Sequence, residues 1–457
     1  MRRLWYTHKN TLWKLLATLL ALGLWQAVAL AIGEELILVT PVKVFLRLFT
    51  IWQTEGFFSA LLLSFLRITL GFILAFLIGI ILAVLAGKLH VIEILLSPYM
   101  TAVKAVPVAS FIVLAYVWFS ASSLSAFIAF LIVLPTVYSH LLSAIKSMPK
   151  EMKEMLFAFD VPFSKRLFTV FLPYLRPFVL SACALGTGLA WKSGVAAEII
   201  TMPSDSIGNL IYYANLWLQS VDLYAYTVLL VLLSILSQLL FSLILRLLFD
   251  LLEHIPTHLV IKDKVPASLK GDITLSHLQK VYEGEVVLAD LSLTIPYGKT
   301  VCLMAPSGRG KTTLMRILAG LEAADAGNIS YQGPVAFVFQ EDLLSLRLNA
   351  VQNAMLGRRG ATAEEATLLL TELGLGEHLK KPASALSGGM RRRVAIARAL
   401  LSQAPLLLLD EALKGLDEAT KERVAAVIRA RAANKTVLAV THDEEDARLL
   451  GGSIQRL

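Results

Sequence analysis

The sequence predicts two unlike domains in one chain, an all-α bundle of six membrane-spanning helices followed by an α/β domain with a phosphate-binding loop. Of its 457 residues, 56% are hydrophobic and 17% are charged, whereas soluble domains carry about 25% charged residues. Residues 1–262 hold 18 Lys and Arg and 12 Asp and Glu, and residues 263–457 hold 24 and 22. A wholly cytosolic enzyme is therefore not expected. We expect lipid around the first half of the chain and water around the second half.

Six stretches of the first half are apolar enough to span a membrane, which takes about 20 residues. The expected helices cover residues 12–32, 59–87, 94–119, 123–143, 177–199 and 223–249. The first stretch also resembles a cleaved signal peptide, but it is long and five more follow it, so an uncleaved helix is favoured. We expect a membrane domain over residues 1–252, a linker over 253–271 and a soluble domain over 272–457.

The positions of the basic residues predict the orientation in the membrane. Basic residues lie at the N-terminus, after the second helix (Lys88), and between the fourth and fifth helices. Lys and Arg in such positions mark the cytoplasmic side. The formal net charge of +8 is thus assigned to orientation in a lipid bilayer, and no nucleic-acid partner is expected. We expect a multi-pass protein of the bacterial cytoplasmic membrane, with its N-terminus and soluble domain in the cytoplasm.

Three charged residues fall within the expected spans, where charges are costly. Lys104 precedes Pro107 in the third helix, and Lys192 and Glu198 flank the small residues SGVAA in the fifth. One interpretation places them on a translocation pathway or gate. The other is that they reach the interface or connect helices inside the bundle.

The soluble domain opens with a phosphate-binding loop. An apolar stretch, residues 301–304, leads into APSGRGKTT, residues 305–313, and then into a helical pattern, which is the strand–loop–helix context that this chemistry requires. Backbone N–H groups would hold the phosphates, Lys311 would reach the β and γ oxygens, and Thr312 would bind Mg²⁺. The expected nucleotide-binding residues here are Ser307, Gly308, Arg309, Gly310, Lys311, Thr312 and Thr313.

A second motif supplies acids for catalysis. The stretch LLLLDE, residues 406–411, is a buried strand that ends in two carboxylates. Asp410 would hold Mg²⁺, and Glu411 is placed to polarise the attacking water as a general base.

Further motifs resemble those of the ABC ATPases and follow one another in the order that this family has. LSGGM, residues 386–390, is similar to the signature motif, and the resemblance implies that Ser387, Gly388 and Gly389 contact the γ-phosphate of a partner subunit. It also implies that Gln340 senses Mg²⁺ and that His442 holds the γ-phosphate. The aromatic Tyr282 would stack on adenine. The basic cluster at residues 391–393 is interpreted as a solvated helix face.

A cytoplasmic segment at about residues 150–176 resembles the EAA loop of binding-protein-dependent ABC importers. Its residues 154–177 read EMLFAFDVPFSKRLFTVFLPYLRP, with Glu154 and a Leu-Pro pair at the family's spacing. Two larger residues replace the family's alanines, and Asp160 replaces its glycine. The resemblance implies that Glu154 and Asp160 lie in a coupling helix that docks on the ATPase.

The whole chain resembles importers of the nitrate, sulfonate and taurine family, with permease and ATPase fused. This implies ATP and Mg²⁺ as cofactors, a second copy of the chain as partner in a homodimer, and an extracytoplasmic solute-binding protein that delivers a small anion or a vitamin precursor. Two alternatives stay open, an ABC exporter and a non-transporting sensory ABC protein. An exporter should lack the EAA-like loop, and a sensory protein should lack part of the catalytic set.

Overall fold

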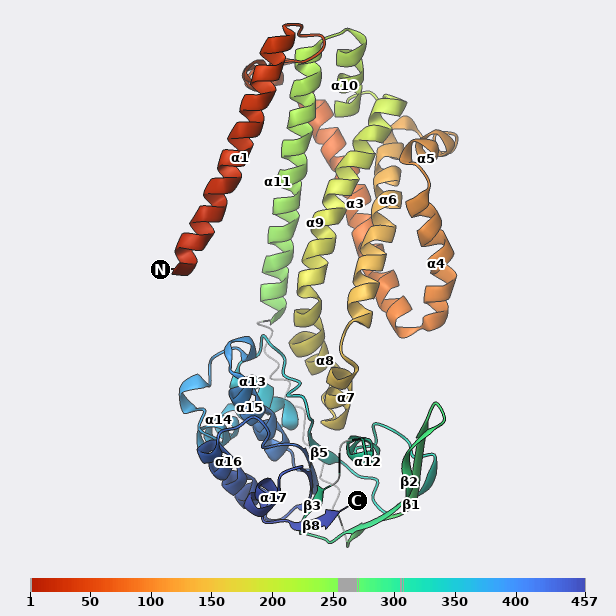
Figure 1. Ribbon diagram of the computed structural model, residues 1–457. Helices are drawn as coiled ribbons and strands as arrows, with labels where there is room; N and C mark the ends of the chain where they lie inside the picture. Colours follow the sequence, from red (N-terminus) through yellow and green to blue (C-terminus); the bar gives the residue numbers. More distant parts are fainter. Residues whose placement is uncertain (1, 254–268, 270, 305, 307, 457) are drawn as a thin grey trace. The chain divides into compact units, whose positions relative to one another are not determined.

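The computed structural model describes residues 2–253, 269, 271–304, 306 and 308–456, and the chain divides into two compact units (Figure 1). One unit comprises Met1–Ser147 and Leu175–Asp250, and the other comprises Met148–Tyr174 and Leu251–Leu457. Most of the expected linker, residues 254–268 and 270, lies outside the described residues. The segment expected to couple the two halves is part of the second unit.

The first unit consists of helices with apolar surfaces. In the described residues, five helices are long and apolar enough to cross a membrane, or up to six if a bent pair counts as one span. Two helices that the sequence pattern did not predict, α2 and α10, lie between the long ones. The helices of this unit are α1 (Arg2–Ile32), α2 (Pro41–Leu48), α3 (Phe57–Lys88), α4 (His90–Ala105), α5 (Val108–Ala115), α6 (Ala121–Lys146), α9 (Leu172–Thr201), α10 (Ile207–Leu216) and α11 (Ser220–Glu253), with a short 3₁₀ turn η1 (Ile51–Gln53).

The third expected span, residues 94–119, is wrong as one straight helix. The structure divides it into α4 and α5, which meet at an angle of 102°. Pro107 has no N–H to continue the helix and disfavours the helical conformation in the preceding residue. Val106 accordingly has an extended conformation, with φ −78° and ψ 133°. The apolar composition was sufficient for a span, but the proline breaks the helix.

The second unit contains two sheets. A parallel sheet has the strand order β5-β6-β7-β3-β8, and an antiparallel sheet has the order β2-β1-β4. The strands are β1 (Ile273–Tyr282), β2 (Glu285–Ile295), β3 (Thr300–Met304), β4 (Ala326–Ile329), β5 (Val335–Val338), β6 (Leu406–Asp410), β7 (Thr436–Val440) and β8 (Ser453–Arg456). The helices after β3 are α12 (Lys311–Leu318), α13 (Ala350–Ala354), α14 (Ala363–Glu372), α15 (Gly388–Leu401), α16 (Glu418–Arg431) and α17 (Glu444–Leu450), with short 3₁₀ turns η3 (Met355–Gly357), η4 (Gly376–His378) and η5 (Ala383–Ala385).

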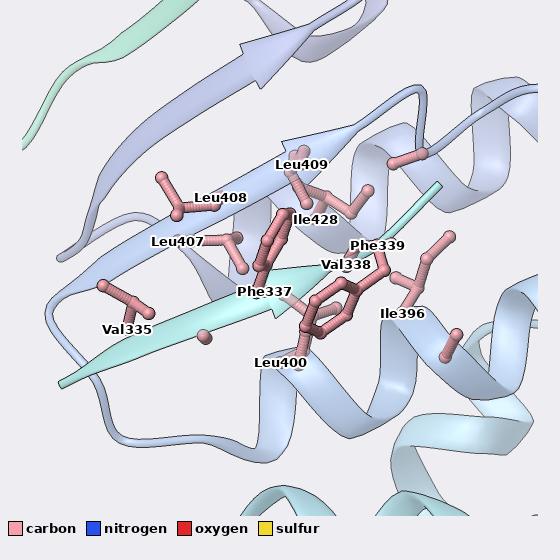
Figure 2. Close-up of a cluster of buried hydrophobic side chains, with 14 of the residues drawn as sticks. Val335, Phe337, Val338, Phe339, Ile396, Leu400, Leu407, Leu408, Leu409 and Ile428 are labelled. Carbon is pink, nitrogen blue, oxygen red and sulfur yellow. The ribbon is translucent and has the colours of Figure 1, made fainter. Parts of the chain in front are cut away.

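The core of the second unit forms where helices cover the parallel sheet. All residues of β5, β6 and β7 are buried, as expected for strands covered on both faces. Figure 2 shows Phe337 and Val338 of β5 and Phe339 just after it among side chains of β6, α15 and α16. The rings of Phe337 and Phe339 stack with their centroids 4.0 Å apart. The packing places the carboxyl ends of these strands at one rigid edge.

The segment 148–174 packs on this ATPase-like unit. It contains α7 (Lys150–Ala158), α8 (Phe163–Arg166) and a π-helical turn η2 (Leu167–Phe171). Met155 and Leu156 stand where the family has alanines, and they are 0% and 1% exposed within the hydrophobic core of the unit. Their larger side chains therefore fill space against the α/β domain.

Candidate functional site

Parallel pairing brings the predicted site residues to one edge of the sheet. Leu303 of β3 pairs with Val440 of β7, and Val440 pairs in turn with Asp410 of β6. The phosphate loop, Glu411 and His442 each follow directly after one of these strands. Ligands bind at the carboxyl ends of the strands in α/β sheets, and the loops gather there because the strand ends are in register.

A pocket of about 330 Å³ lies at this edge. Nine of the predicted residues line it together with two valines that the sequence analysis missed. The lining residues are Val287, Gly308, Gly310, Lys311, Thr312, Thr313, Gln340, Asp410, Glu411, Val440 and His442. Val440 could have been found as the last residue of a buried strand before a Thr-His pair, whereas Val287 carries no motif.

The phosphate loop has the backbone conformation that its glycines permit. Gly308 and Gly310 have φ of 83° and 72°, which side chains disfavour. A Cβ on Gly310 would also lie 2.7 Å from the carbonyl oxygen of Val287. Lys311 begins α12, and its Nζ donates to the carbonyl of Pro306 at 2.7 Å. Ser307 lies outside the described residues, as does Ala305, which replaces the motif's first glycine.

Two oxygen-bearing side chains meet beside the loop. Thr312 Oγ1 donates to Asp410 Oδ2 at 3.1 Å, and Asp410 is 2% exposed. Burial raises the pKa of Asp410, and the hydrogen bond from Thr312 opposes this. Hydroxyl and carboxylate oxygens are the ligands that Mg²⁺ prefers, so this pair fits the expected metal.

Glu411 is held from two sides. His442 Nε2 lies 3.0 Å from its Oε1, and Lys414 Nζ lies 2.5 Å from its Oε2. Burial raises the pKa of Glu411, but the hydrogen bond and charge of Lys414, with the charges of His442 and Lys311, outweigh burial and lower it. The carboxylate is thus kept ionised, as a general base must be. Lys414 was not identified from the sequence.

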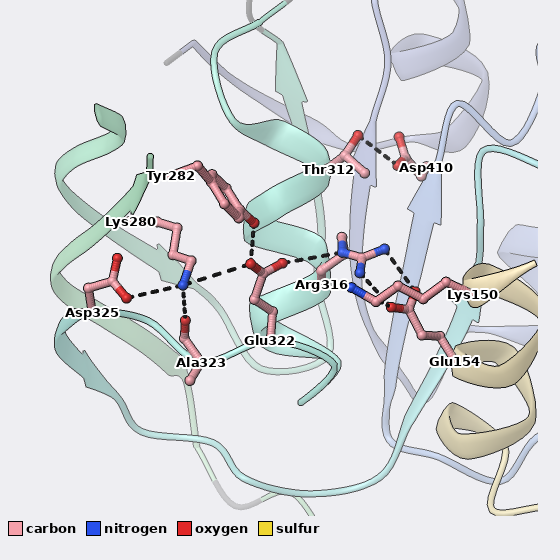
Figure 3. A network of polar contacts seen from close by, with 10 residues as sticks. All are labelled: Lys150, Glu154, Lys280, Tyr282, Thr312, Arg316, Glu322, Ala323, Asp325 and Asp410. Atoms are coloured by element: carbon pink, nitrogen blue, oxygen red, sulfur yellow. Dashed lines mark hydrogen bonds and ion pairs between the residues drawn. The ribbon is translucent and has the colours of Figure 1, made fainter. Parts of the chain in front are cut away.

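The remaining predicted nucleotide residues lie apart from the pocket lining. Tyr282 is 40% exposed, and its hydroxyl donates to Glu322 (Figure 3). Arg309 is exposed on the phosphate loop. Ser387 is the N-cap of α15, where its side chain accepts from Met390 N at 3.4 Å, and Gly388 and Gly389 form the first turn.

Arg392 corrects the interpretation of residues 391–393 as a solvated helix face. It is 4% exposed and donates to the carbonyls of Phe339, Gln340, Asp410, Glu411 and Ala412 at 2.6–3.1 Å. It therefore fixes two pocket segments relative to each other. The sequence could have predicted that Arg392 is buried, because it lies four residues before Ile396 and residues at this spacing share one face of a helix.

Glu154, the predicted coupling residue, contacts the helix that follows the phosphate loop. Arg316 of α12 donates from Nη1 and Nη2 to the two carboxylate oxygens at 2.8 and 2.6 Å (Figure 3). Lys150 Nζ lies 3.7 Å from the same carboxylate. Glu154 is 9% exposed, and a bidentate pair of this kind fixes both position and orientation.

The charged residues of the membrane unit have different environments. Glu198 is 0% exposed and accepts from Ser64 Oγ at 2.7 Å and from Gly208 N at 3.3 Å. Lys192 is exposed. Lys104 is also exposed, and it donates to Ser139 Oγ of α6 at 2.5 Å. The contacts of Glu198 connect α9 to α3 and α10, and the pathway roles of all three stay predictions.

Comparisons with known proteins identify both halves. Residues 75–254 match the family of binding-protein-dependent transport system inner membrane components, and residues 288–414 match the ABC transporter family. The aliphatic sulfonates import ATP-binding protein SsuB 1 of Pseudomonas fluorescens is 41% identical over 189 residues, which are 41% of this chain and 73% of that protein.

Other relatives match the same half. The SsuB 1 protein of Rhodococcus jostii is 39% identical, over 42% of this chain and 80% of its own length. The spermidine/putrescine import ATP-binding protein PotA of Salmonella paratyphi A is 35% identical, over 42% of this chain and 56% of its own length. A solved bacterial ABC transporter cassette, the dimeric structure of MJ0796, is 30% identical with a TM-score of 0.38, and the match covers 40% of this chain and 94% of that chain. With its inner membrane component and its ATP-hydrolysing component in one polypeptide, the chain belongs to the ABC transporters.

Proposed function

We propose that this chain imports a small anion, delivered by an extracytoplasmic binding protein, and that two copies of the chain form the working transporter. The observation that carries the proposal is the second compact unit, which holds both a pocket lined by nine of the predicted nucleotide-site residues and an importer-type coupling loop. The names of the sulfonate import relatives favour an aliphatic sulfonate as solute. The loop disfavours an exporter, and the intact catalytic set disfavours a purely sensory protein.

ATP would bind with its phosphates against the phosphate loop. Gly310, Lys311, Thr312 and Thr313 at the start of α12 line the pocket, and the N–H groups of a helix N-terminus and a lysine ammonium suit an anion. Thr312, Gln340 and Asp410 are the residues that would hold Mg²⁺, which supplies positive charge against the phosphate oxygens. Tyr282 would contact adenine from the antiparallel sheet.

Hydrolysis would depend on Glu411. Its ionised carboxylate would take a proton from the attacking water as the water oxygen bonds to the γ-phosphorus and the bond from that phosphorus to the bridging oxygen of the β-phosphate breaks. The carboxylic acid would then release the proton to phosphate or to solvent. The products are ADP and inorganic phosphate. His442, 3.0 Å from Glu411, would orient the γ-phosphate and the base together.

The signature residues would complete the site of a second copy. Ser387, Gly388 and Gly389 do not line the pocket of their own chain, and they lie at the N-terminus of α15, where N–H groups favour anions. A head-to-tail homodimer would place them on the partner's γ-phosphate. In the proposed topology, both ATPase domains and the N-termini are cytoplasmic.

A trapping experiment tests the function. The Glu411→Gln variant should keep ATP bound and lose hydrolysis by at least about 100-fold, since removing a general base costs 10²–10⁴. A pull-down of this variant with ATP from native membranes should therefore retain the external binding protein, identified by mass spectrometry. The captured protein is then titrated calorimetrically with taurine, nitrate and spermidine.

The controls separate the parts of the proposal. Lys311→Ala should bind less ATP and capture no partner. Capture of one external protein that binds taurine would support sulfonate import, and one that binds spermidine would contradict the anion. An ATP-loaded trap without any external partner would contradict import, and wild-type hydrolysis in Glu411→Gln would contradict the catalytic assignment.

A further inference from the structure

The residue after the coupling helix α7 has an unusual backbone. Asp160 has φ of +45°, a left-handed conformation that glycine adopts most readily. The helix ends with hydrogen bonds from Asp160 N to Phe157 O at 2.9 Å and from Val161 N to Leu156 O at 3.1 Å. These two bonds define a Schellman motif, whose left-handed position is usually glycine. Aspartate adopts this conformation less readily than glycine, so a contact that holds it there would stabilise the turn.

Arg359 supplies that contact. Its Nη2 lies 2.8 Å from Asp160 Oδ2, and its Nε donates to the Asp160 carbonyl oxygen at 3.0 Å. The arginine therefore holds both the side chain and the backbone of the strained residue. A glycine at this position could accept only the backbone bond, so the carboxylate contact requires the aspartate side chain.

The segment that carries Arg359 is closely packed on α15. A Cβ on Gly357 would lie 1.8 Å from the backbone oxygen of Arg398, so only glycine allows this approach. The loop contacts the same region twice more: Lys165 Nζ donates to the Met355 carbonyl at 3.2 Å, and the Arg398 guanidinium lies 5.3 Å from the centre of the Phe159 ring. The Asp160 end of the loop is thus attached to α15.

The Glu154 end is attached elsewhere. Arg316, its partner, belongs to α12, which begins with Lys311 at the phosphate loop. By contrast, α15 begins after Ser387. Glu154 therefore contacts α12, which starts at the phosphate site, whereas Asp160 contacts the turn at Arg359. That turn follows a segment packed on α15, the helix that starts at the signature residues.

We propose that Asp160 and Arg359 form a positioning pair that ties the coupling loop to the signature helix, while Glu154 and Arg316 tie it to the phosphate-loop helix. The inference rests on the proposed function. Because closure of the ATP site moves the signature helix of one copy toward the phosphate loop of the other, a loop fixed at both ends responds to that movement. Without the Asp160–Arg359 pair, the loop keeps only the Lys165 and Phe159 contacts on that side, so it should follow α15 less closely than α12.

Hydrogen–deuterium exchange of the full chain in lipid nanodiscs tests the pair, with and without a non-hydrolysable ATP analogue and Mg²⁺. In the wild type, the nucleotide should slow exchange in peptides covering residues 308–318 and 155–165. Asp160→Asn keeps a residue that tolerates the left-handed conformation but removes the charge. It should reduce the nucleotide response of the loop peptide about two- to fivefold, as for one exposed ion pair, and leave the response of residues 308–318 intact.

A double-mutant cycle identifies the partner. If Asp160 acts through Arg359, Asp160→Asn should add no further loss in an Arg359→Gln background. Arg358→Gln removes the same charge one residue away, from a side chain that pairs with Glu365, and should leave the loop response unchanged. Asp160→Gly removes the backbone strain altogether, so it folds in any case and should match Asp160→Asn.

Each outcome decides between the proposals. A full loop response in Asp160→Asn and Asp160→Gly overturns the inference, and so do losses that multiply in the double variant. A wild-type chain in which residues 308–318 respond but the loop does not also contradicts it. If neither peptide responds in the wild type, the proposed ATP site itself is wrong.

Discussion

Two neighbouring acids at the end of β6 have opposite electrostatic environments. Asp410 is buried beside Thr312, and burial raises its pKa. Glu411 is also partly buried, but Lys414 and the other nearby cations lower its pKa. Although Asp410 and Glu411 are adjacent in the chain, their pKa values therefore shift in opposite directions. Asp410 faces Thr312, and Glu411 has the environment expected of a base.

Lys414 should control the pH dependence of hydrolysis. Its charge favours ionised Glu411, so Lys414→Met should raise the pKa of Glu411. The acidic limb of the ATPase pH–rate profile should then move to higher pH, because a close opposite charge that favours the ionised form has been removed. Lys414→Arg keeps the charge and should keep the wild-type limb. An unchanged profile in Lys414→Met would show that Lys414 does not tune the base.

Among the elements, α7 makes the charged contact that predicts coupling. Glu154 is nearly buried and accepts two hydrogen bonds from Arg316. Arg316 Nε also donates to Glu322 at 3.3 Å, and Glu322 accepts from Tyr282 (Figure 3). Arg316 of α12 is therefore held by Glu154 of α7 and also by Glu322. A change at Glu154 leaves the contact of Arg316 with Glu322 in place.

Reversing the charge of Glu154 should uncouple transport from hydrolysis. Glu154→Arg places two cations together, and breaking a nearly buried pair costs about 3–5 kcal/mol of docking energy. Solute uptake by cells should fall at least tenfold while the purified chain still hydrolyses ATP. Arg316→Glu in the same chain restores an opposite pair and should recover part of the uptake. Normal uptake in Glu154→Arg alone would remove this residue from the coupling contact.

Membrane elements depend on equally specific contacts. Glu198 accepts from Ser64, and Ser64 Oγ accepts from Ile207 N at 2.9 Å. A Cβ on Gly208 would lie 2.3 Å from Cβ of Glu198. The carboxyl group therefore connects the end of α9 to α3 and to the start of α10, because the glycine lets the backbones approach closely.

At the scale of the whole molecule, the proposed homodimer would divide each ATP site between two copies of the chain. The pocket holds Lys311 and Glu411, whereas Ser387 lies outside its lining. If the sites are shared between two copies, a defect in one copy damages only the site to which that residue belongs. This arrangement can be distinguished from an independent site in each chain.

Mixed dimers of differently tagged chains should show the sharing. Lys311→Ala in one copy and Ser387→Arg in the other concentrate both defects in one site and leave the second site intact. The control carries both substitutions in one copy beside a wild-type partner, so that each site has one defect. Tandem-purified dimers of the first kind should hydrolyse ATP several-fold faster than the control. Equal rates in the two kinds would contradict the shared site.

The sequence predicted features that depend on neighbouring residues better than features that depend on contacts between distant segments. The phosphate loop, Asp410–Glu411 and Gln340 could be predicted because each motif is local and follows a strand. Arg392 was missed because helical spacing could place it on the buried face of α15 but could not show that it binds carbonyls of distant segments. The break at Pro107 was missed because the length of an apolar run does not show whether the helix within it is straight or bent.

The sequence by itself determined the two kinds of domain, the family and most of the pocket lining, because hydropathy and motif spacing are local properties of the chain. Only the tertiary structure decided which charges meet. Glu154 with Arg316 and Asp160 with Arg359 are 162 and 199 residues apart. Folding alone brings them together, since the order of the strands and the packing of α12 and α15 determine where each arginine lies.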